Sequence, residues 1–544
     1  MEERIWHKSY DPPVPSSLTY PKIPLKELFR RNVMDYPDKP YLIINDLELS
    51  YRTVNMLANG LANYLLSLGV KKGDRVALMM PNIPQYVMGF QACLKIGAIL
   101  VPTNFQYTRH ELEHTFKDST PKVVVVLAAF STNVIDLHES GTYQFEKILT
   151  VQLMNMPLEV KPCSAAIDFN EAIQGLADFS EPDIEVLPED LAMLQYTGGT
   201  TGVSKGCCLS NANVLAMALQ TATCMSAKCP FSEVKTLAAI PLYHIYGENT
   251  NINVCLISGG TIVLVPDPTN PLHILEAIKK HRPTVWASVP AMIIGVNNHP
   301  QTPNYDISSI KVIVGGSSPM AVEAIRKFEA LSGGTIIEGY GLSESSNVLT
   351  VNPITKRKIG TVGVPMANVD IRIVDLETGT QDMPLGEPGE LIAKAPQIMS
   401  GYWQNQAETD NVLRDGWLYT GDIATMDEEG YVTIVDRKKD MIICSGFNVY
   451  PRDIDEVLYE HPKVLETCCI GVADEKRGES PKAYVVLKLG ETATTEELLA
   501  FCREKLTAYK VPRYIEFINE LPRTQIGKPD RKALKEFDSG KNQA

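Results

Sequence analysis

A buried-strand pattern that runs into a loop of glycine, threonine and lysine near residue 200 limits the folds open to this chain. The apolar run Leu191 to Tyr196 has the length of a buried β-strand. It leads into Thr-Gly-Gly-Thr-Thr-Gly-Val-Ser-Lys at 197–205, and Ser210 then begins a helical pattern. Glycines let backbone N–H groups approach an anion closely, and the hydroxyls and the lysine add donors. The pattern favours a polyphosphate-binding loop after a strand, although a glycine-rich surface turn is an equally ordinary reading.

This loop is not a Walker phosphate loop. The Walker pattern requires Gly-x-x-x-x-Gly-Lys-Ser/Thr. Here Val203 and Ser204 separate Gly202 from Lys205, and Gly206 follows the lysine. Other parts of the chain must therefore identify the loop.

Helical and strand-like patterns alternate through the first 345 residues, an order typical of layered α/β structures. Residues 53–68 and 85–96 repeat apolar side chains at helical spacing. The expected strands are 74–80, 98–102, 123–127, 191–196, 236–240, 261–265, 284–288, 311–314 and 335–338. At 544 residues the chain is too long for one hydrophobic core, so we expect two or more domains.

The pattern changes after residue 345. Between 360 and 435, short strands separated by Gly, Pro and Asp turns predict a small β-rich subdomain. The charged run 436–440 marks its end, although such a run can also be a solvated strand edge. A smaller unit that mixes helices and strands is expected beyond it. Its helices are expected at 453–460 and 495–508, and its strands at 465–472, 483–489 and 514–517.

Two loops after expected strands carry candidate ligand-binding residues, because ligands of doubly wound sheets bind where the carboxyl ends of strands open into loops. The loop 241–247 places His244 among aromatic and apolar neighbours, where a hydrogen-bonded core histidine is the commoner reading. The loop 314–319 contains Gly316 and Ser317, and its glycines permit close approach to a flat ligand such as adenine. Taken alone, each loop could be a simple turn.

A third loop, at 338–345, combines an aromatic ring with a carboxylate in Glu-Gly-Tyr-Gly-Leu-Ser-Glu-Ser. Tyr340 can stack on a base, and Glu344 can hold Mg²⁺ against phosphate oxygens because a hard cation prefers oxygen ligands. Two later residues are candidates of lower specificity. Asp422 follows a glycine, as turn-forming aspartates often do, and Lys528 is a loop lysine, which is more often solvated than catalytic.

Together these motifs resemble the adenylate-forming superfamily of acyl-CoA synthetases, peptide-synthetase adenylation domains and beetle luciferases. The superfamily pattern Tyr-Thr-Ser/Gly-Gly-Thr-Thr-Gly-x-Pro-Lys-Gly matches 196–206 except at Ser204, where proline is usual. The resemblance rests on five ordered motifs over nearly the whole chain. It implies an α/β fold with a large N-terminal AMP-binding domain, 1–436, made of two α/β layered subdomains and a small β-barrel-like subdomain. It also implies a small, mobile α+β C-terminal domain, 437–544, with a hinge near Lys439.

The resemblance also implies roles for single residues. Catalytic roles fall to Lys528, the adenylation lysine, and to Thr197, Glu344 and His244, with Mg²⁺ on Glu344 and Thr197. His244 is expected where the carboxylate substrate meets the nucleotide, and Gly446 beside the incoming thiol. The residues expected to contact the nucleotide or the thiol are Thr197, Gly198, Gly199, Thr200, Thr201, Gly202, Lys205, Gly316, Ser317, Gly339, Tyr340, Gly341, Ser343, Asp422, Arg437, Gly446 and Lys528.

The reaction implied is ATP-dependent conversion of a fatty acid to acyl-AMP and pyrophosphate, followed by thioester formation with CoA. The motif variants resemble medium- or long-chain fatty acyl-CoA ligases most. An aryl-CoA ligase, a carrier-loading adenylation enzyme and a non-catalytic nucleotide-binding protein stay open as alternatives. Glu248 is an unexpected charge near the mouth of the implied acyl channel, where it either faces away or restricts chain length.

Composition limits the partners and the location. The net charge of −14 argues against nucleic acid as the main partner, because phosphate binding needs a basic surface. Eleven scattered cysteines without a Cys-x-x-Cys pair indicate reduced, mostly buried thiols. No apolar run reaches the length of a membrane span, and no signal peptide is evident, so a cytoplasmic protein is expected. Peripheral membrane contact for substrate uptake stays open, as does the choice between monomer and homodimer.

Overall fold

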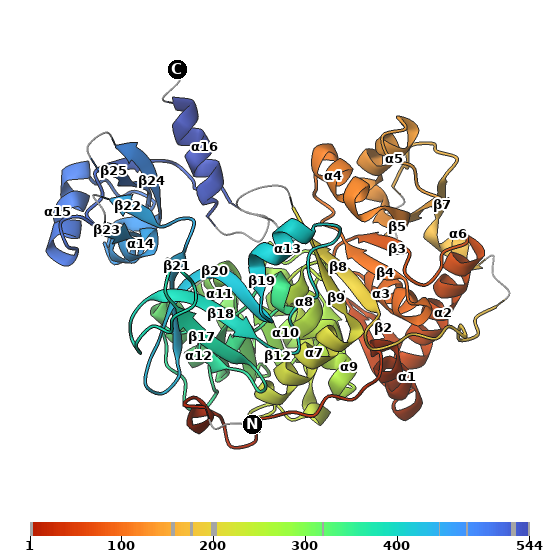
Figure 1. Cartoon of the computed structure of the whole chain (residues 1–544). Helices are drawn as coiled ribbons and strands as arrows, with labels where there is room; N and C mark the ends of the chain where they lie inside the picture. Colours follow the sequence, from red (N-terminus) through yellow and green to blue (C-terminus); the bar gives the residue numbers. More distant parts are fainter. Residues whose placement is uncertain are drawn as a thin grey trace. The chain divides into compact units, whose positions relative to one another are not determined.

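The computed structural model describes residues 4–153, 158–174, 178–196, 204–317, 320–444, 447–474, 477–523 and 529–541. The chain forms two compact units (Figure 1). Within the described residues, the larger unit contains 204–370 and 394–418 together with the chain up to 196. The smaller unit contains 371–393 and the chain from 419 onward.

A seven-stranded sheet forms the first layer of the larger unit, in the order β7-β6-β5-β3-β4-β8-β9. All neighbouring strands are parallel except β8 and β9, which are antiparallel. The strands are β3 (Arg75–Met79), β4 (Ile99–Pro102), β5 (Pro121–Leu127), β6 (Lys147–Val151), β7 (Ala166–Asp168), β8 (Leu191–Tyr196) and β9 (Gly206–Ser210). Parallel strands that helices cover are buried on both faces, which explains the continuous apolar runs of β3, β4 and β5.

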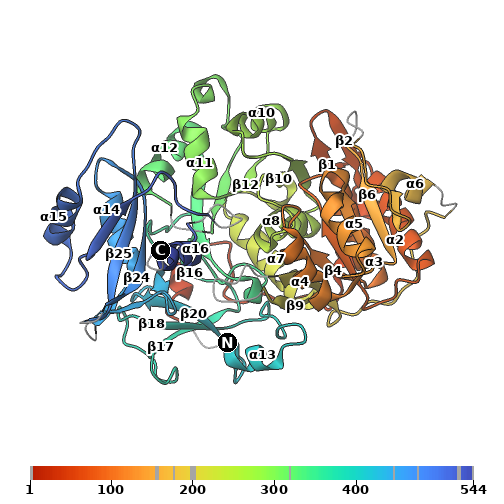
Figure 2. The ribbon, with the colours of Figure 1, turned by 90° about the horizontal axis from the view of Figure 1, so that it is seen from above.

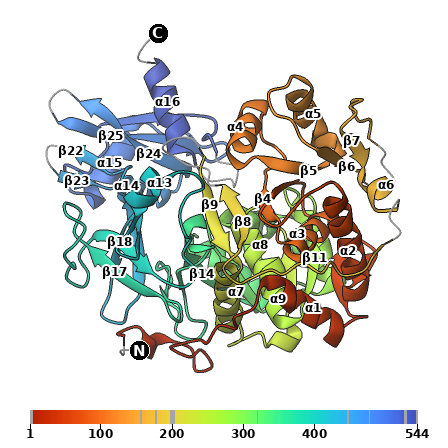
Figure 3. The ribbon, with the colours of Figure 1, turned by 45° about the vertical axis from the view of Figure 1, so that its right-hand side comes forward.

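Helices cover both faces of this sheet. Figures 1 and 3 show α4 and α5 on one side and α2 and α3 on the other. Their apolar sides complete the core; Phe116 of α4, for example, is fully buried against the sheet. The helices are α2 (Tyr51–Ser67), α3 (Pro84–Ile96), α4 (Arg109–Ser119), α5 (Ser131–Glu139) and α6 (Phe169–Gln174).

A nine-stranded sheet forms the second layer of the larger unit, in the order β16-β15-β14-β13-β12-β10-β11-β1-β2. The strands from β14 to β1 are mutually parallel. Ser288, Gly315 and Glu338 are register partners, so β12, β13 and β14 end at one edge. The strands are β1 (Pro40–Ile44), β2 (Leu47–Ser50), β10 (Lys235–Ala238), β11 (Thr261–Leu264), β12 (Val285–Ser288), β13 (Val312–Gly315), β14 (Thr335–Tyr340), β15 (Thr350–Val351) and β16 (Val364–Pro365).

Helices also cover this second sheet. In Figure 2, α10, α11 and α12 lie along one side of β10 and β12, and α7 and α8 lie on the other. Trp286, fully buried, packs its ring 5.5 Å from that of Phe328 in the core beneath α12. The helices are α1 (Leu25–Asp35), α7 (Asn211–Met225), α8 (Ile245–Glu248), α9 (Val254–Ser258), α10 (Pro271–His281), α11 (Pro290–Asn298) and α12 (Val322–Ser332).

Two five-stranded sheets contain the other strands of the described residues. One has the order β17-β18-β20-β19, with β21 paired to β20, and the other has the order β23-β22-β25-β24, with β26 paired to β25. The first contains β17 (Asp370–Val374), β18 (Gly389–Lys394), β19 (Leu413–Arg414), β20 (Trp417–Met426) and β21 (Val432–Arg437). The second contains β22 (Ile442–Cys444), β23 (Phe447–Val449), β24 (Val464–Asp474), β25 (Gly478–Leu487) and β26 (Tyr514–Phe517).

The C-terminal sheet has its own hydrophobic core. Ile454 and Leu458 of α14 and Leu498 of α15 are buried against it. The helices in the smaller unit are α14 (Pro451–Tyr459), α15 (Thr495–Lys505) and α16 (Arg531–Lys541), and α13 (Gln406–Val412) belongs to the larger unit.

The α/β fold expected from the sequence is confirmed, and the nine strands expected in the larger unit lie within two residues of the observed bounds. Several strands of the larger unit were missed, among them β1, β2, β6, β7 and β9. Strand β9 follows the glycine-rich loop directly, before the helix that Ser210 caps. The eleven cysteines are free thiols, and most of them are buried. Among the described residues, no helix combines the length and apolar character needed to cross a membrane.

Candidate active site

The hairpin of β8 and β9 carries the glycine- and threonine-rich loop. Tyr196 and Gly206 are register partners at its end, and a Cβ atom on Gly206 would lie 3.1 Å from the Tyr196 ring. The Tyr196 hydroxyl donates to Asp118 of α4, which anchors the strand at the point where the loop begins. The candidate residues Thr197, Gly198, Gly199, Thr200, Thr201 and Gly202 lie outside the described residues.

Lys205, on the other side of that loop, has a defined environment. Its Nζ donates to Oε2 of Glu408 at 2.5 Å and lies 4.7 Å from the centre of the Tyr402 ring. The hydrogen bond from Lys205 lowers the pKa of the Glu408 carboxyl, which therefore stays ionised as a counter-ion. The ammonium group is thus held by a carboxylate and an aromatic face together.

Glu344 joins the same group of side chains. The Tyr402 hydroxyl donates to its Oε1 at 2.7 Å, and the Met399 amide donates to its backbone carbonyl at 2.8 Å. Burial and then the nearby Glu344 carboxylate raise the pKa of the Tyr402 hydroxyl, so it remains a donor. The candidate phosphate ligand Lys205 and the candidate metal ligand Glu344 therefore contact the same tyrosine.

The His244 loop is fixed from both sides. The Nδ1 atom of His244 accepts from the Tyr246 amide at 3.2 Å, and His244 caps α8. The Tyr246 hydroxyl donates to the Val314 carbonyl at 2.5 Å and lies 3.0 Å from the Ser288 carbonyl, at the ends of β13 and β12. His244, half-buried, is thereby tied to the edge where those strands end.

The loop after β13 shows two signs of a ligand site. Ser317 has a backbone φ of +78°, which an L-residue seldom adopts, and its buried Oγ has no hydrogen-bond partner. A Cβ on Gly316 would lie 3.2 Å from the Tyr246 ring. Buried hydroxyls without a hydrogen-bond partner are rare in folded proteins, so the Ser317 hydroxyl favours a ligand-binding role for this loop.

Tyr340 lies half-buried at the end of β14, between two glycines. Neighbouring backbone leaves little or no room for a side chain at either glycine. A Cβ on Gly341 would lie 1.5 Å from the Asn347 carbonyl oxygen, and a Cβ on Gly339 would lie 3.0 Å from the Thr350 carbonyl oxygen. Ser343 begins the short 3₁₀ turn that holds Glu344. The glycines therefore fold the chain back so that the ring and the carboxylate leave the same strand end.

Hydrogen bonds connect these loops across the two sheets of the larger unit. Gln195 of β8 donates to the Tyr243 carbonyl at 3.3 Å, beside His244. Asn82, 3% exposed, donates to the Ala238 and Ile240 carbonyls and accepts from the Leu242 amide. The β8–β9 hairpin, the His244 loop and the loops after β13 and β14 thus form one connected region.

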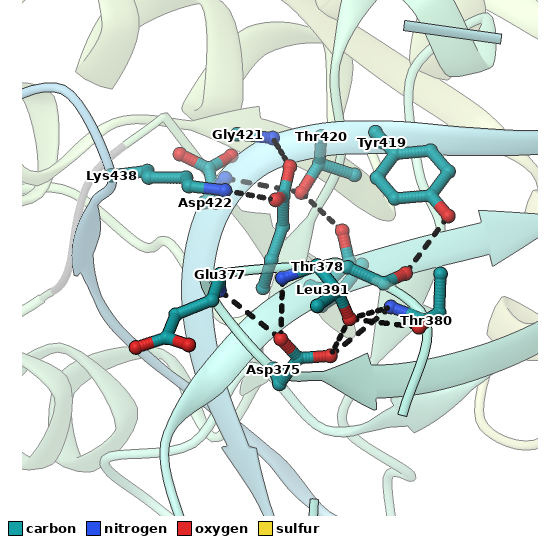
Figure 4. Close-up of polar contacts among 12 residues, drawn as sticks. Asp375, Glu377, Thr378, Thr380, Leu391, Tyr419, Thr420, Gly421, Asp422 and Lys438 are labelled. Atoms are coloured by element: carbon teal, nitrogen blue, oxygen red, sulfur yellow. Dashed lines mark hydrogen bonds and ion pairs between the residues drawn. The ribbon is translucent and has the colours of Figure 1, made fainter. Parts of the chain in front are cut away.

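Asp422 and Arg437 form a separate pair within the smaller unit. They are register partners on β20 and β21, with Arg437 Nε 3.2 Å from Asp422 Oδ1. Figure 4 shows Asp422 next to Thr420, whose hydroxyl accepts from the Asp422 amide and donates to the Leu391 carbonyl. The Asp422 side chain is only 3% exposed, so its carboxylate is held in place by the sheet.

Glu248 is buried rather than exposed at a channel mouth. It is fully buried at the end of α8, where Oε1 accepts from Asn253 Nδ2 at 3.2 Å and Oε2 has no partner. Burial raises the pKa of this carboxyl from 4.5 to about 8. The residue that the sequence indicated as a charge is therefore mainly neutral at pH 7, and a π-helical turn of buried polar residues follows it at Asn249–Asn253.

Two candidate residues, Gly446 and Lys528, lie outside the described residues. Three contacts were missed at the sequence level: Asn82, Tyr402 and Glu408. Asn82 lies in a Pro-Asn turn just after β3, a position that is typical of a residue that only ends a strand. Tyr402 and Glu408 lie in a polar turn and in a short helix, where spacing gave no signal.

The residues present fit a magnesium ion that arrives with a nucleotide. Mg²⁺ is usually held by one or two carboxylates together with substrate phosphates and water. Glu344 supplies such a carboxylate, and Tyr402 orients it. Among the described residues, no group of three or more His, Cys, Asp or Glu side chains gathers as a protein-only metal site.

Relatives with curated names match the chain over nearly its whole length. The long-chain-fatty-acid–CoA ligase of Bacillus subtilis is 40% identical, covering 99% of this chain and 98% of the relative. The enzyme of that name from Yersinia pestis is 37% identical and covers 98% of each chain. The similarity therefore includes the C-terminal part as well as the larger unit.

Solved structures of the same architecture match equally fully. The anthranilate CoA ligase AuaEII in complex with anthranoyl-AMP superposes with a TM-score of 0.85 at 26% identity, covering 96% of this chain and 98% of that one. ATP-bound MatB from Rhodopseudomonas palustris gives 0.84 at 29% identity, with 95% and 99% coverage.

Family models agree with both comparisons. The AMP-binding enzyme model matches residues 29–403, and the model of the AMP-binding enzyme C-terminal domain matches 453–528. The resemblance to adenylate-forming enzymes that the motifs indicated is thereby confirmed. This chain belongs to the AMP-binding enzyme family.

Proposed function

We propose that this protein activates a fatty carboxylic acid with ATP and transfers the acyl group to CoA. The first step gives acyl-AMP and pyrophosphate, and the second gives acyl-CoA and AMP. The observation that carries the proposal is the full-length similarity to proteins named long-chain-fatty-acid–CoA ligases. ATP and CoA are the co-substrates that this reaction requires.

The chemistry depends on charge neutralisation and alignment. A carboxylate is a poor electrophile, so its oxygen attacks the α-phosphorus and pyrophosphate leaves; a thiol then displaces AMP from the mixed anhydride. Preorganised donors and cations stabilise the charge that develops on the phosphates. Lys205, with the hydroxyls and amides of 197–202, supports the leaving pyrophosphate in this proposal. Mg²⁺ bound near Glu344 would neutralise phosphate charge.

Other residues would contact the adenine and the ribose of the nucleotide. Tyr340 would pack on adenine. Gly316 and Ser317 would contact the same base, and the unpartnered Ser317 hydroxyl supports a ligand at that loop. Asp422 would accept hydrogen bonds from the ribose hydroxyls, and its buried, sheet-held carboxylate suits that role. Arg437 would contact the ribose or a phosphate.

The two half-reactions would use different parts of the C-terminal domain. We keep the predicted boundary, 1–436 and 437–544, with the hinge near Lys439. Lys528 would bind the carboxylate and the α-phosphate during adenylation, and Gly446 would lie beside the thiol during thioester formation. Peripheral membrane contact would bring a long-chain acid to the enzyme.

Pyrophosphate release over a panel of fatty, aromatic and amino acids, with and without CoA, tests the proposal. We expect release with medium- or long-chain fatty acids and acyl-CoA formation when CoA is added. Preference for benzoate-like acids would instead identify an aryl-CoA ligase, and preference for amino acids a carrier-loading enzyme. No release with any acid would contradict an enzymatic role.

Lys528→Ala separates the two half-reactions. We expect this variant to lose acyl-adenylate formation by roughly 100- to 1000-fold, the usual effect of removing one electrostatic contact to a transition state. Thioester formation from supplied acyl-adenylate should stay near the wild-type rate. Equal losses in both steps would contradict the division of roles.

A further inference from the structure

Tyr402 connects two residues that are 139 positions apart in the chain, Lys205 and Glu344. Its ring faces the Lys205 ammonium at 4.7 Å, and its hydroxyl donates to Glu344 Oε1 at 2.7 Å. In the proposed function, the lysine binds phosphate and the carboxylate lies near Mg²⁺. One side chain therefore determines where a phosphate-binding cation and a metal-binding carboxylate stand relative to each other.

Backbone hydrogen bonds hold the segment around Tyr402 against β9, which follows Lys205, and against Glu344. Residues 400–403 run beside β9: the Cys208 amide donates to the Gly401 carbonyl at 2.9 Å, and the Trp403 amide donates to the Gly206 carbonyl at 2.8 Å. Cys207 and Tyr402 form a β-bridge. On the other side, Met399 donates to the Glu344 carbonyl at 2.8 Å.

The helix after Tyr402 completes the arrangement. The Thr409 hydroxyl oxygen of α13 accepts from the Tyr402 amide at 2.9 Å, and Glu408 in the first turn of α13 accepts from Lys205. Asn411 donates to the other Glu408 oxygen at 3.3 Å. The counter-ion of Lys205 and the support of Glu344 thus come from one short segment, 402–411.

We propose that Tyr402 is a positioning residue for ATP binding, which sets the Glu344 carboxylate through its hydroxyl and the Lys205 ammonium through its ring. This proposal rests on the proposed function, because it takes ATP as the ligand. Tyr402 itself acts through Lys205 and Glu344. Groups that hydrogen-bond a metal-ligating carboxylate commonly affect metal affinity or activity by 10- to 100-fold.

Two substitutions separate the contact with Lys205 from the contact with Glu344. Tyr402→Phe keeps the ring on Lys205 and removes only the hydroxyl on Glu344, whereas Tyr402→Leu removes both. Tyr143→Phe is the matched control, because it removes another partly buried hydroxyl, one that donates to the Pro121 carbonyl at 2.7 Å within the N-terminal sheet. Circular dichroism and thermal melting confirm that each variant is folded.

The readout is ATP affinity without any acid, measured by titration calorimetry in excess MgCl₂ and again in EDTA. The ratio of the two affinities measures the coupling between metal and nucleotide and involves no turnover. For Tyr402→Phe we expect this ratio to fall by about tenfold, with unchanged affinity in EDTA. For Tyr402→Leu we expect a further loss in EDTA of roughly two- to fivefold, the value of a cation–π contact at a partly exposed site.

Two results would overturn the proposal. One is a Tyr402→Phe variant that matches Tyr143→Phe in both conditions; the other is an equal loss with and without Mg²⁺, which would indicate a merely structural tyrosine. If Tyr402→Leu does not fold, Tyr402→Phe alone decides. A wild-type protein that binds no ATP in either condition would refute the proposed function itself, and that outcome is distinct from a failure of Tyr402.

Discussion

Replacing Glu248 with glutamine should change how local stability depends on pH. The carboxyl is fully buried, with one hydrogen bond from Asn253 and an unpartnered second oxygen, and burial raises its pKa from 4.5 to about 8. Glutamine has nearly the shape of the protonated acid but cannot ionise. The substitution therefore removes the titration while it keeps the packing.

The sign follows from the raised pKa. Below pH 4.5 the carboxyl is protonated in both folded and unfolded chains, so it imposes no ionisation penalty. Between pH 4.5 and 8 the unfolded chain releases a proton that the folded chain keeps, and stability falls as the pH rises. The loss grows by about 1.4 kcal/mol per pH unit and reaches about 5 kcal/mol above pH 8.

Hydrogen exchange of peptides covering 245–258 measures the local stability around Glu248 at each pH. The method avoids assuming two-state unfolding of a long chain. We expect Glu248→Gln and wild type to differ least near pH 5. Between pH 5 and pH 7.5 the variant should gain about 3 kcal/mol of protection relative to wild type. Glu323→Gln, at an exposed position of α12, is the control and should show no such trend. A constant difference between wild type and Glu248→Gln at every pH would refute the burial argument.

Three further substitutions test the site. Gly341→Ala places a Cβ 1.5 Å from the Asn347 carbonyl oxygen, so the loop must move, and calorimetry should show ATP affinity reduced by tenfold or more. Unchanged affinity would contradict the close packing. Tyr246→Phe removes the hydroxyl that donates to the Val314 carbonyl, and it should lower the hydrogen-exchange protection of peptides covering 285–288 and 312–315 by about 1 to 3 kcal/mol; unchanged protection would disprove this contribution. Asp422→Asn should raise the KM for ATP by roughly 10- to 100-fold while the KM for the acid stays constant, because it weakens a charged hydrogen bond of about 1.5 to 3 kcal/mol to the ribose; equal changes in both KM values would argue against a ribose contact.

Much of the fold was predictable because apolar runs and glycines report local structure directly. The run 191–196 had to be a strand, and the glycines near Tyr340 had to allow a close turn, as the Gly341 contact demonstrates. The three loops at 241–247, 314–319 and 338–345 could be placed at one sheet edge because parallel strands end together.

Long-range pairing was not predictable from spacing. Tyr402 reaches the site only because it bridges to Cys207 across the sheet edge, and no periodicity connects the two. The burial of Glu248 could not be predicted from the sequence either. The structure buries this carboxyl, and burial raises its pKa so that it is mainly neutral at pH 7. The strand β9 was missed because Cys207 and Cys208 follow a lysine and a glycine, which resemble a loop.

The fate of the carboxylate oxygen tests the central claim most directly. The protein is incubated with a fatty acid labelled with ¹⁸O in both carboxyl oxygens, together with ATP, MgCl₂ and CoA, and the AMP and pyrophosphate are analysed by mass spectrometry. Attack of the carboxylate on the α-phosphorus predicts one ¹⁸O atom in each AMP formed and none in pyrophosphate. Unlabelled AMP, or label in inorganic phosphate with ADP as the product, would contradict the acyl-adenylate mechanism.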